Sequence, residues 1–138
     1  MAMRLKSLFS GSLLLTALTG CTSIQPPICS PGEHSVGLDT LYFGTAKPDG
    51  VVSLEEWATF LSDTVTPTSP EGLTSWVASG QWKTSTGFLE QERTYVLQLA
   101  HDENQEKDRA VHRIMQNYKN RFQQEAVMRI RSHACRSF

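Results

Sequence analysis

The sequence lacks the patterns that mark most cofactor and catalytic sites. It has no glycine-rich phosphate loop and no dinucleotide fingerprint, and no serine lies in a nucleophile-elbow context. The four histidines are scattered, and neither Cys29 nor Cys135 has the ligand spacing of a zinc site. We therefore expect no metal and no cofactor, and we assign no catalytic residue.

An excess of positive charge is also missing. The 138 residues contain 13 Lys and Arg against 14 Asp and Glu, which gives no reason to expect nucleic acid as a partner. Eight of the basic residues lie between Lys107 and Phe138. This basic region has two interpretations: a surface that attracts anionic groups, or a solvated helix face and tail that folds back on the acidic half.

Only one long hydrophobic run is present, and it is N-terminal. Arg4 and Lys6 precede an apolar stretch over residues 7–18, and Leu18-Thr-Gly-Cys21 closes it. This layout is typical of a secretory signal peptide. Its end resembles a bacterial lipobox, in which cleavage after Gly20 leaves Cys21 as a lipid-modified N-terminus. The alternative is a secreted protein whose signal ends near a chance cysteine.

The predicted lipid anchor determines where the protein is expected. Acyl chains on Cys21 would hold it stably at a membrane, and no other segment is apolar for long enough to span one. By analogy with enterobacterial sorting, Thr22 favours the outer membrane. We expect a cell-envelope lipoprotein that faces the periplasm, with a signal peptide at 1–20, a lipidated N-terminus and flexible tether at 21–37 and one domain at 38–138.

Two cysteines remain after Cys21 in a compartment that permits disulfides. A bridge between Cys29 and Cys135 would close a loop that covers almost the whole mature chain. The alternative is two free thiols.

The periodicity of the chain predicts four strands and two helices. Ser53 and Glu56 form a capping box that begins the first helix, and Pro67 and Pro70 end it. The expected strands cover 39–45, 73–83, 88–100 and 126–131, and the second helix covers 103–122. The order is β-α-β-β-α-β, which predicts an α+β, ferredoxin-like sandwich with two helices on one face of a four-stranded antiparallel sheet.

This fold leaves the second face of the sheet uncovered. In its usual strand order the first and third strands are central, which places Tyr42 and Gln98 in the middle of that face. We expect Arg129 and Arg131 on the same face. An uncovered face must be polar, pair with another subunit or bind a ligand.

An ordered set of motifs resembles the bacterial DUF3574 family, a domain of unknown function. The resemblance extends from about Leu38 to Phe138, and its motifs are Leu41-Tyr-Phe-Gly44, Asp49-Gly50, Ser53-Leu-Glu-Glu-Trp57, Phe60-Leu61, Val65-Thr-Pro67, Pro70-Glu-Gly-Leu-Thr74, Gly80-Gln-Trp82, Tyr118-Lys-Asn-Arg-Phe-Gln-Gln-Glu125 and Ala134-Cys-Arg-Ser-Phe138. Members of the family are often small secreted or lipid-anchored proteins. The resemblance implies no particular activity.

Gly80, Gln81 and Trp82 form the best candidate ligand site. Glutamine supplies a donor and an acceptor, tryptophan supplies a large apolar face, and glycine permits close approach. Tyr42 could complete such a pocket. The competing interpretation is a β-bulge with a core tryptophan.

Arg129 and Arg131 form a second candidate site. They alternate along one predicted strand face and could clamp an anionic ligand. The competing interpretation is an edge strand protected by charge.

Three functions remain open. The first is a non-catalytic domain that binds an envelope protein, a glycan or a small anionic ligand through the open face. The second is a homodimer in which two open faces pack into an α/β barrel. The third is a cofactor-free enzyme with a cavity lined by Tyr42, Gln81 and Gln98.

Overall fold

The computed structural model describes residues 28–138, which form four long strands and two helical segments. The long strands are β1 (His34–Gly44), β4 (Thr74–Lys83), β5 (Leu89–His101) and β6 (Val127–Arg136). The first helical segment comprises α1 (Leu54–Phe60), the π-helical turn η1 (Leu61–Val65) and α2 (Thr66–Thr68). The second is α3 (Gln105–Phe122).

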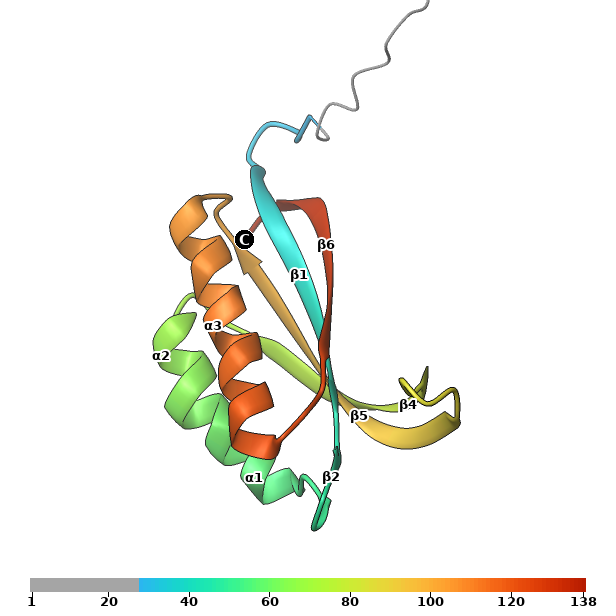
Figure 1. Ribbon diagram of the computed structural model, residues 1–138. Helices are drawn as coiled ribbons and strands as arrows, with labels where there is room; N and C mark the ends of the chain where they lie inside the picture. Colours follow the sequence, from blue (N-terminus) through green and yellow to red (C-terminus); the bar gives the residue numbers. More distant parts are fainter. Residues whose placement is uncertain (1–27) are drawn as a thin grey trace, which may run out of the picture.

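The long strands form one antiparallel sheet in the order β4-β5-β1-β6. Both helical segments lie on the same side of this sheet (Figure 1). The prediction of an α+β fold with a four-stranded antiparallel sheet and two helices is confirmed. Tyr42 and Gln98 belong to the two central strands, β1 and β5.

The element order differs from the predicted one in two respects. Two short strands, β2 (Ala46–Lys47) and β3 (Gly50–Val51), form a separate small hairpin before α1. The first helix also contains the π-helical turn η1 before it reaches Pro67. The strands of the hairpin have two residues each and η1 has five, so neither feature is long enough to show a sequence periodicity.

The N-terminal boundary of the domain lies earlier than predicted. β1 begins at His34, so residues 34–37 belong to the sheet and not to a tether. These residues pair with the C-terminal part of β6, from His34 opposite Arg136 to Gly37 opposite His133. Ser35 and Gly37 are weak strand formers, and pairing with β6 outweighs that preference.

Local signals explain where both helices begin. The Ser53 hydroxyl accepts from the Glu56 amide, and the Glu56 carboxylate accepts from the Ser53 amide, which is the predicted capping box. Asn104 caps α3 by accepting from the Lys107 amide. Gln123 ends α3 in the left-handed conformation, with φ of 54°.

The core lies between the sheet and the helices and is rich in aromatic rings. Phe43, Trp57, Phe60 and Tyr118 pack against one another with ring centroids 4.6–6.2 Å apart. The buried phenol of Tyr118 donates to the Gly44 carbonyl at 2.8 Å. Burial raises the pKa of Tyr118, so this phenol stays a neutral donor.

Cys29 and Cys135 are joined by a disulfide, with their Cα atoms 5.5 Å apart. The bridge ties the segment before β1 to the end of β6. The predicted signal peptide and Cys21 lie outside the described residues. Within residues 28–138, no helix is both long and apolar enough to cross a membrane.

Candidate binding surface and cleft

The sheet face opposite the helices is uncovered and lacks charge at its centre. Strand alternation and register place Trp76, Val96, Tyr42 and Met128 in one row across β4, β5, β1 and β6. The next row is Thr74, Gln98, Thr40 and Ile130. None of these eight side chains is charged. We call these two rows the open face.

Large hydrophobic groups of the open face are in contact with solvent. Trp76 is 43% exposed, Met128 54% and Ile130 51%. Val96 is 1% exposed because Trp76 and Tyr42 flank it on the neighbouring strands. Contiguous apolar surface of this kind marks a binding site more often than isolated exposed residues do.

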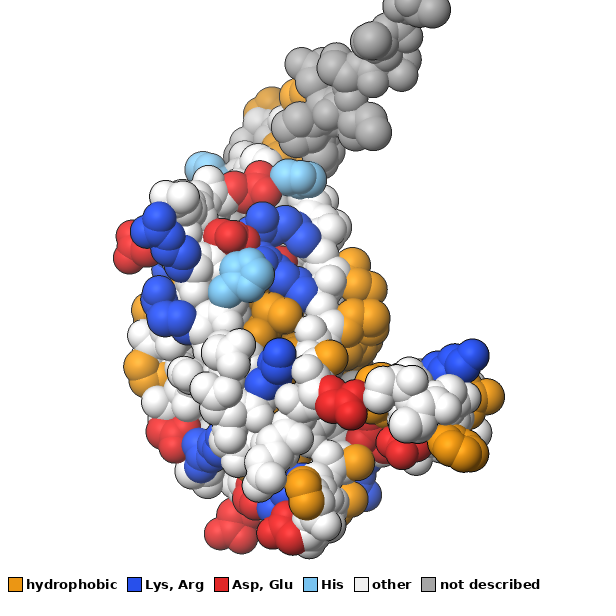
Figure 2. Space-filling view, in the orientation of Figure 1, with side chains coloured by type: hydrophobic (Ala, Val, Ile, Leu, Met, Phe, Trp, Pro, Cys, Tyr) orange, Lys and Arg blue, Asp and Glu red, His pale blue; other side chains and the backbone are white. Residues whose placement is uncertain are grey.

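The paired ends of β4 and β5 project beyond the body of the domain (Figure 1). We call residues 80–92 the arm; none of them is buried. The arm carries Trp82 and, at its tip, Phe88 and Leu89, which are 73% and 68% exposed. Figure 2 shows hydrophobic side chains at the tip of the arm and along the margin of the body that adjoins it.

The concave side of the arm and the body enclose an open cleft of about 410 Å³. Its lining includes Tyr42, Gly80, Gln81 and Trp82, together with Glu92, Gln124 and Met128. The structure therefore brings together four residues of the predicted ligand site. Gln98 does not line the cleft; its amide lies 3.4 Å from the Thr40 hydroxyl on the open face.

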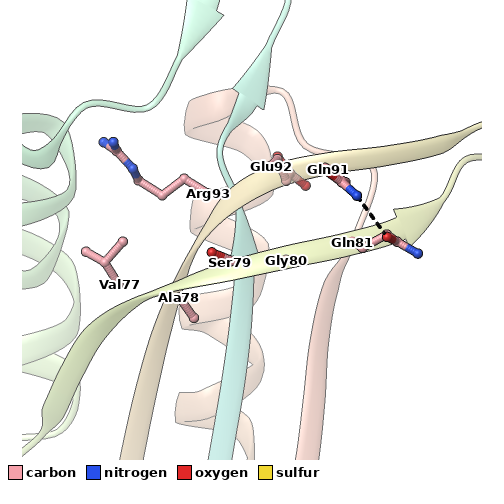
Figure 3. Close-up of a pocket in the computed structure, with 8 residues that line it drawn as sticks. All are labelled: Val77, Ala78, Ser79, Gly80, Gln81, Gln91, Glu92 and Arg93. Atoms are coloured by element: carbon pink, nitrogen blue, oxygen red, sulfur yellow. Dashed lines mark hydrogen bonds between the residues drawn. The ribbon is translucent and has the colours of Figure 1, made fainter.

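Gly80 and Gln81 present different faces of β4. Gly80 and Trp82 share the side of the open face, and alternation turns the Gln81 side chain to the other side. There the Gln91 amide donates to the Gln81 oxygen at 3.3 Å. Figure 3 shows this pair beside a second, shallow hollow, with Val77 and Arg93 pointing toward the helical side. Gln81 lines the cleft, but alternation turns its side-chain amide away from the open face.

Glu92 fixes the base of the arm. Its carboxylate accepts from the amides of Thr45 and Ala46, each at 2.8 Å, and the Thr45 hydroxyl donates to the Arg93 carbonyl. A Cβ atom at Gly80 would lie 2.0 Å from the Thr94 hydroxyl oxygen. Gly80 therefore permits close contact between β4 and β5 where the arm leaves the body, and the arm has a defined position.

Arg129 and Arg131 do not lie on the open face, so that prediction is wrong. They face Asp39 on β1 and Asp108 on α3, on the helix-covered side. Arg129 donates to both Asp39 oxygens, at 2.8 and 2.7 Å, and to Asp108 at 2.9 Å. The expected anion clamp is occupied by the protein's own carboxylates. β6 is nevertheless an edge strand.

Asp39 is fully buried at the centre of this network. Burial favours a higher pKa for Asp39, but hydrogen bonds from Arg129 and His101 and the nearby Arg131 charge outweigh it and lower the pKa. His101 Nε2 lies 2.8 Å from the Asp39 carboxylate, and its Nδ1 lies 2.9 Å from the Asp102 carbonyl. The Asp39 carboxylate and the Asp102 carbonyl are both hydrogen-bond acceptors. The imidazole therefore satisfies both contacts when each ring nitrogen carries a hydrogen. The network is a structural ion-pair cluster.

Sequence reasoning missed three residues that shape these surfaces. Met128 and Ile130 alternate with the arginines on β6, so the same period-2 pattern could have placed them opposite. Glu92 carried no local signal, because its partners lie 47 and 46 residues away in the chain. Within residues 28–138, no group of three His, Cys, Asp or Glu side chains is arranged to hold a metal ion.

A family model described as "Protein of unknown function (DUF3574)" matches residues 38–138. The chain belongs to the DUF3574 family. No curated protein matches the sequence significantly. Among solved structures, this DUF3574 chain is similar to a phage SAM lyase in complex with S-methyl-5'-thioadenosine, with a TM-score of 0.60 and 10% identity. The similarity covers 81% of this chain and 95% of the phage chain, and at this identity it concerns the fold alone.

Proposed function

We propose that this DUF3574 protein is a non-catalytic binding module of the bacterial cell envelope. The observation that carries the proposal is the open face, where Trp76, Met128 and Ile130 remain exposed. The tip of the adjoining arm also exposes Phe88 and Leu89. Covering such a surface with a partner is favourable, because each Å² of apolar area removed from water contributes about 25 cal/mol. Its lack of charge favours a protein partner over a small anion.

The N-terminus supplies the location in this proposal. Lipid on Cys21 would tether the domain to a membrane, most simply the outer membrane on its periplasmic side. The disulfide between Cys29 and Cys135 is consistent with an oxidising compartment.

The order β4-β5-β1-β6 also supports a ferredoxin-like classification, to which the β2–β3 hairpin and η1 are additions.

The anchor is tested by Cys21→Ser in cells. We expect the wild-type chain in the membrane fraction with the mass of attached acyl chains, and the variant in the soluble fraction or as uncleaved precursor. A wild-type chain without acyl mass would contradict the lipoprotein proposal.

The open face is tested by photo-crosslinking of the full chain in cells. A benzophenone amino acid is introduced at Ile130 on the open face or, as a matched control, at Asn117, which is exposed on α3. We expect discrete adducts from position 130 and none from position 117. Absence of any adduct from position 130 would refute the proposed binding function.

The cleft supports a second candidate, a cofactor-free enzyme. Tyr42 and Trp82 line a concavity of about 410 Å³, and the structurally similar phage protein is named as a SAM lyase. The discriminating assay is release of S-methyl-5'-thioadenosine from S-adenosylmethionine by the purified chain. Release that is lost in Tyr42→Phe would favour the enzyme; our primary proposal expects no release.

A further inference from the structure

We propose that the partner of the open face is a second copy of this chain, and that each copy lays its arm on the open face of the other. This inference rests on the proposed function, because it names the occupant of the same surface. It adds a specific contact: Phe88 and Leu89 of one copy against Trp76, Met128 and Ile130 of its partner.

The arm is an ordered hairpin whose hydrophobic tip is exposed to solvent. Thr84 and Phe88 close the hairpin through a backbone hydrogen bond of 2.8 Å, and the Phe88 amide also donates to the Thr84 hydroxyl at 3.1 Å. Gly87 adopts a positive φ of 91° that this turn requires. The ordered tip then presents Phe88 and Leu89 to solvent, where neither contributes to the core.

The open face is a hydrophobic, uncharged surface that could receive such a tip. Its two rows combine exposed hydrophobic side chains with Thr74, Thr40 and Gln98, so Phe88 and Leu89 would meet no charged side chain of these rows. Glu92 holds the arm at its base, which keeps the tip at a defined distance from the body. A rigid arm loses little conformational entropy on binding.

The available area matches a dimer of ordinary size. The six exposed hydrophobic residues of the arm and the open face are Trp76, Trp82, Phe88, Leu89, Met128 and Ile130. Scaled from the area of about 150–250 Å² that an aromatic side chain can bury, they expose together roughly 600 Å². A standard interface buries about 800 Å² per partner, including its polar rim. Arm and open face together therefore supply most of this area and the polar rim the remainder, whereas either alone falls well short.

Reciprocal exchange also closes the assembly. In a twofold dimer the contact of tip with face occurs twice, so both apolar surfaces of both copies are covered and none remains to recruit a third. The arm lies at the end of β5 that begins with Leu89, whereas the start of β1 lies opposite the other end, with Gly37 beside His101. Pairing through the arms thus leaves the N-terminal connection to the predicted anchor unobstructed.

The test uses two differently tagged full-length copies expressed in the same cells. A benzophenone amino acid replaces Phe88 in one copy, and crosslinked species are purified through both tags in turn. We expect an adduct of twice the chain mass, with the crosslink in the strand that contains Met128 and Ile130. Ile130→Lys in the second copy should reduce this adduct at least tenfold.

Val51→Lys in the second copy is the matched control, because Val51 is similarly exposed but belongs to the β2–β3 hairpin. This variant should leave the adduct unchanged.

A second variant, Phe88→Ser with Leu89→Ser, alters only the exposed tip. It should abolish two-tag co-purification without the probe while the chain stays folded. Absence of a two-tag adduct overturns the inference. If position 130 still crosslinks to a different protein, the proposed binding function stands; if it crosslinks to nothing, both fail.

Discussion

The carboxylate of Asp39 determines the arrangement of charge under α3. It is fully buried and receives hydrogen bonds from Arg129 and His101, and Arg131 lies within 3.5 Å. Among residues 28–138, the other carboxylate partner of Arg129 is Asp108. A paired, hydrogen-bonded charge is tolerated inside a protein, but removal of one partner leaves the other desolvated and unpaired.

We therefore expect Asp39→Ala to lower the free energy of unfolding by about 3–5 kcal/mol. Asp63→Ala is the matched control, because Asp63 pairs with Arg121 at the surface, where solvent screens the half-exposed carboxylate. Its cost should be much smaller than that of Asp39→Ala. Urea unfolding under oxidising conditions measures both. Equal costs would show that the Asp39 network does not stabilise the fold.

The same carboxylate predicts an acid-sensitive component of stability. The pKa of Asp39 is lower in the folded protein than the ordinary aspartate value of 3.8. Its stabilising contribution is thus fully present above that value and is lost as the pH falls below it through the folded pKa. In urea titrations from pH 5 to pH 2, the free energy of unfolding should fall more steeply in the wild type than in Asp39→Asn. Parallel slopes would contradict this assignment.

At the scale of elements, β4 and β5 each serve two purposes. One part of each strand contributes to the sheet: Val96 and Leu97 of β5 are buried there. The other part continues as the arm, in which no residue is buried. Gly80 lies at the transition, where a larger residue would collide with Thr94.

Gly80→Ala should therefore destabilise the domain by about 1–3 kcal/mol, because the added methyl group forces the Thr94 side chain or the β4 backbone to move. Ser79→Ala, at the neighbouring exposed position, should change stability by less than about 0.5 kcal/mol. Thermal or urea unfolding of the two variants provides the comparison. A Gly80→Ala variant as stable as the wild type would show that Thr94 rotates away without cost.

At the scale of the whole molecule, the disulfide joins the two ends of the described chain. It links residues 106 positions apart, beside the outer pairs of β1 and β6. Besides the bridge, backbone pairing with β1 holds the edge strand β6 at this end, together with exposed side-chain contacts such as that between His133 and Glu103.

The double variant Cys29→Ser/Cys135→Ser should lose about 2–5 kcal/mol of unfolding free energy, as is typical when a native bridge is removed from a small secreted domain. Wild-type protein treated with a reductant should unfold at the same urea concentration as the variant. Hydrogen exchange should rise first in residues 34–37 and 132–136. A loss below about 1 kcal/mol would mean that the sheet edge holds without the bridge.

Local sequence signals were sufficient to identify the four long strands and the two main helices. The Ser53–Glu56 capping box involves groups three residues apart, and the period-2 pattern of β5 needs no partner to be recognised. Such interactions are formed within one segment, so sequence spacing specifies them. The α+β class followed from the order of these segments. The pairing of Cys29 with Cys135 was expected because they are the two cysteines that remain after Cys21.

The assignment of faces required the tertiary structure. Alternation shows that Arg129 and Arg131 share a side of β6, but a register shift of one residue would turn both to the other side. The register is decided by partners on β1 and α3, because the partly buried Arg129 is stable only where Asp39 and Asp108 neutralise it. These partners lie 90 and 21 residues away in the chain. The sequence alone therefore determined the long strands and the main helices. Only packing decided which side of β6 contacts solvent, and with it the composition of the open face.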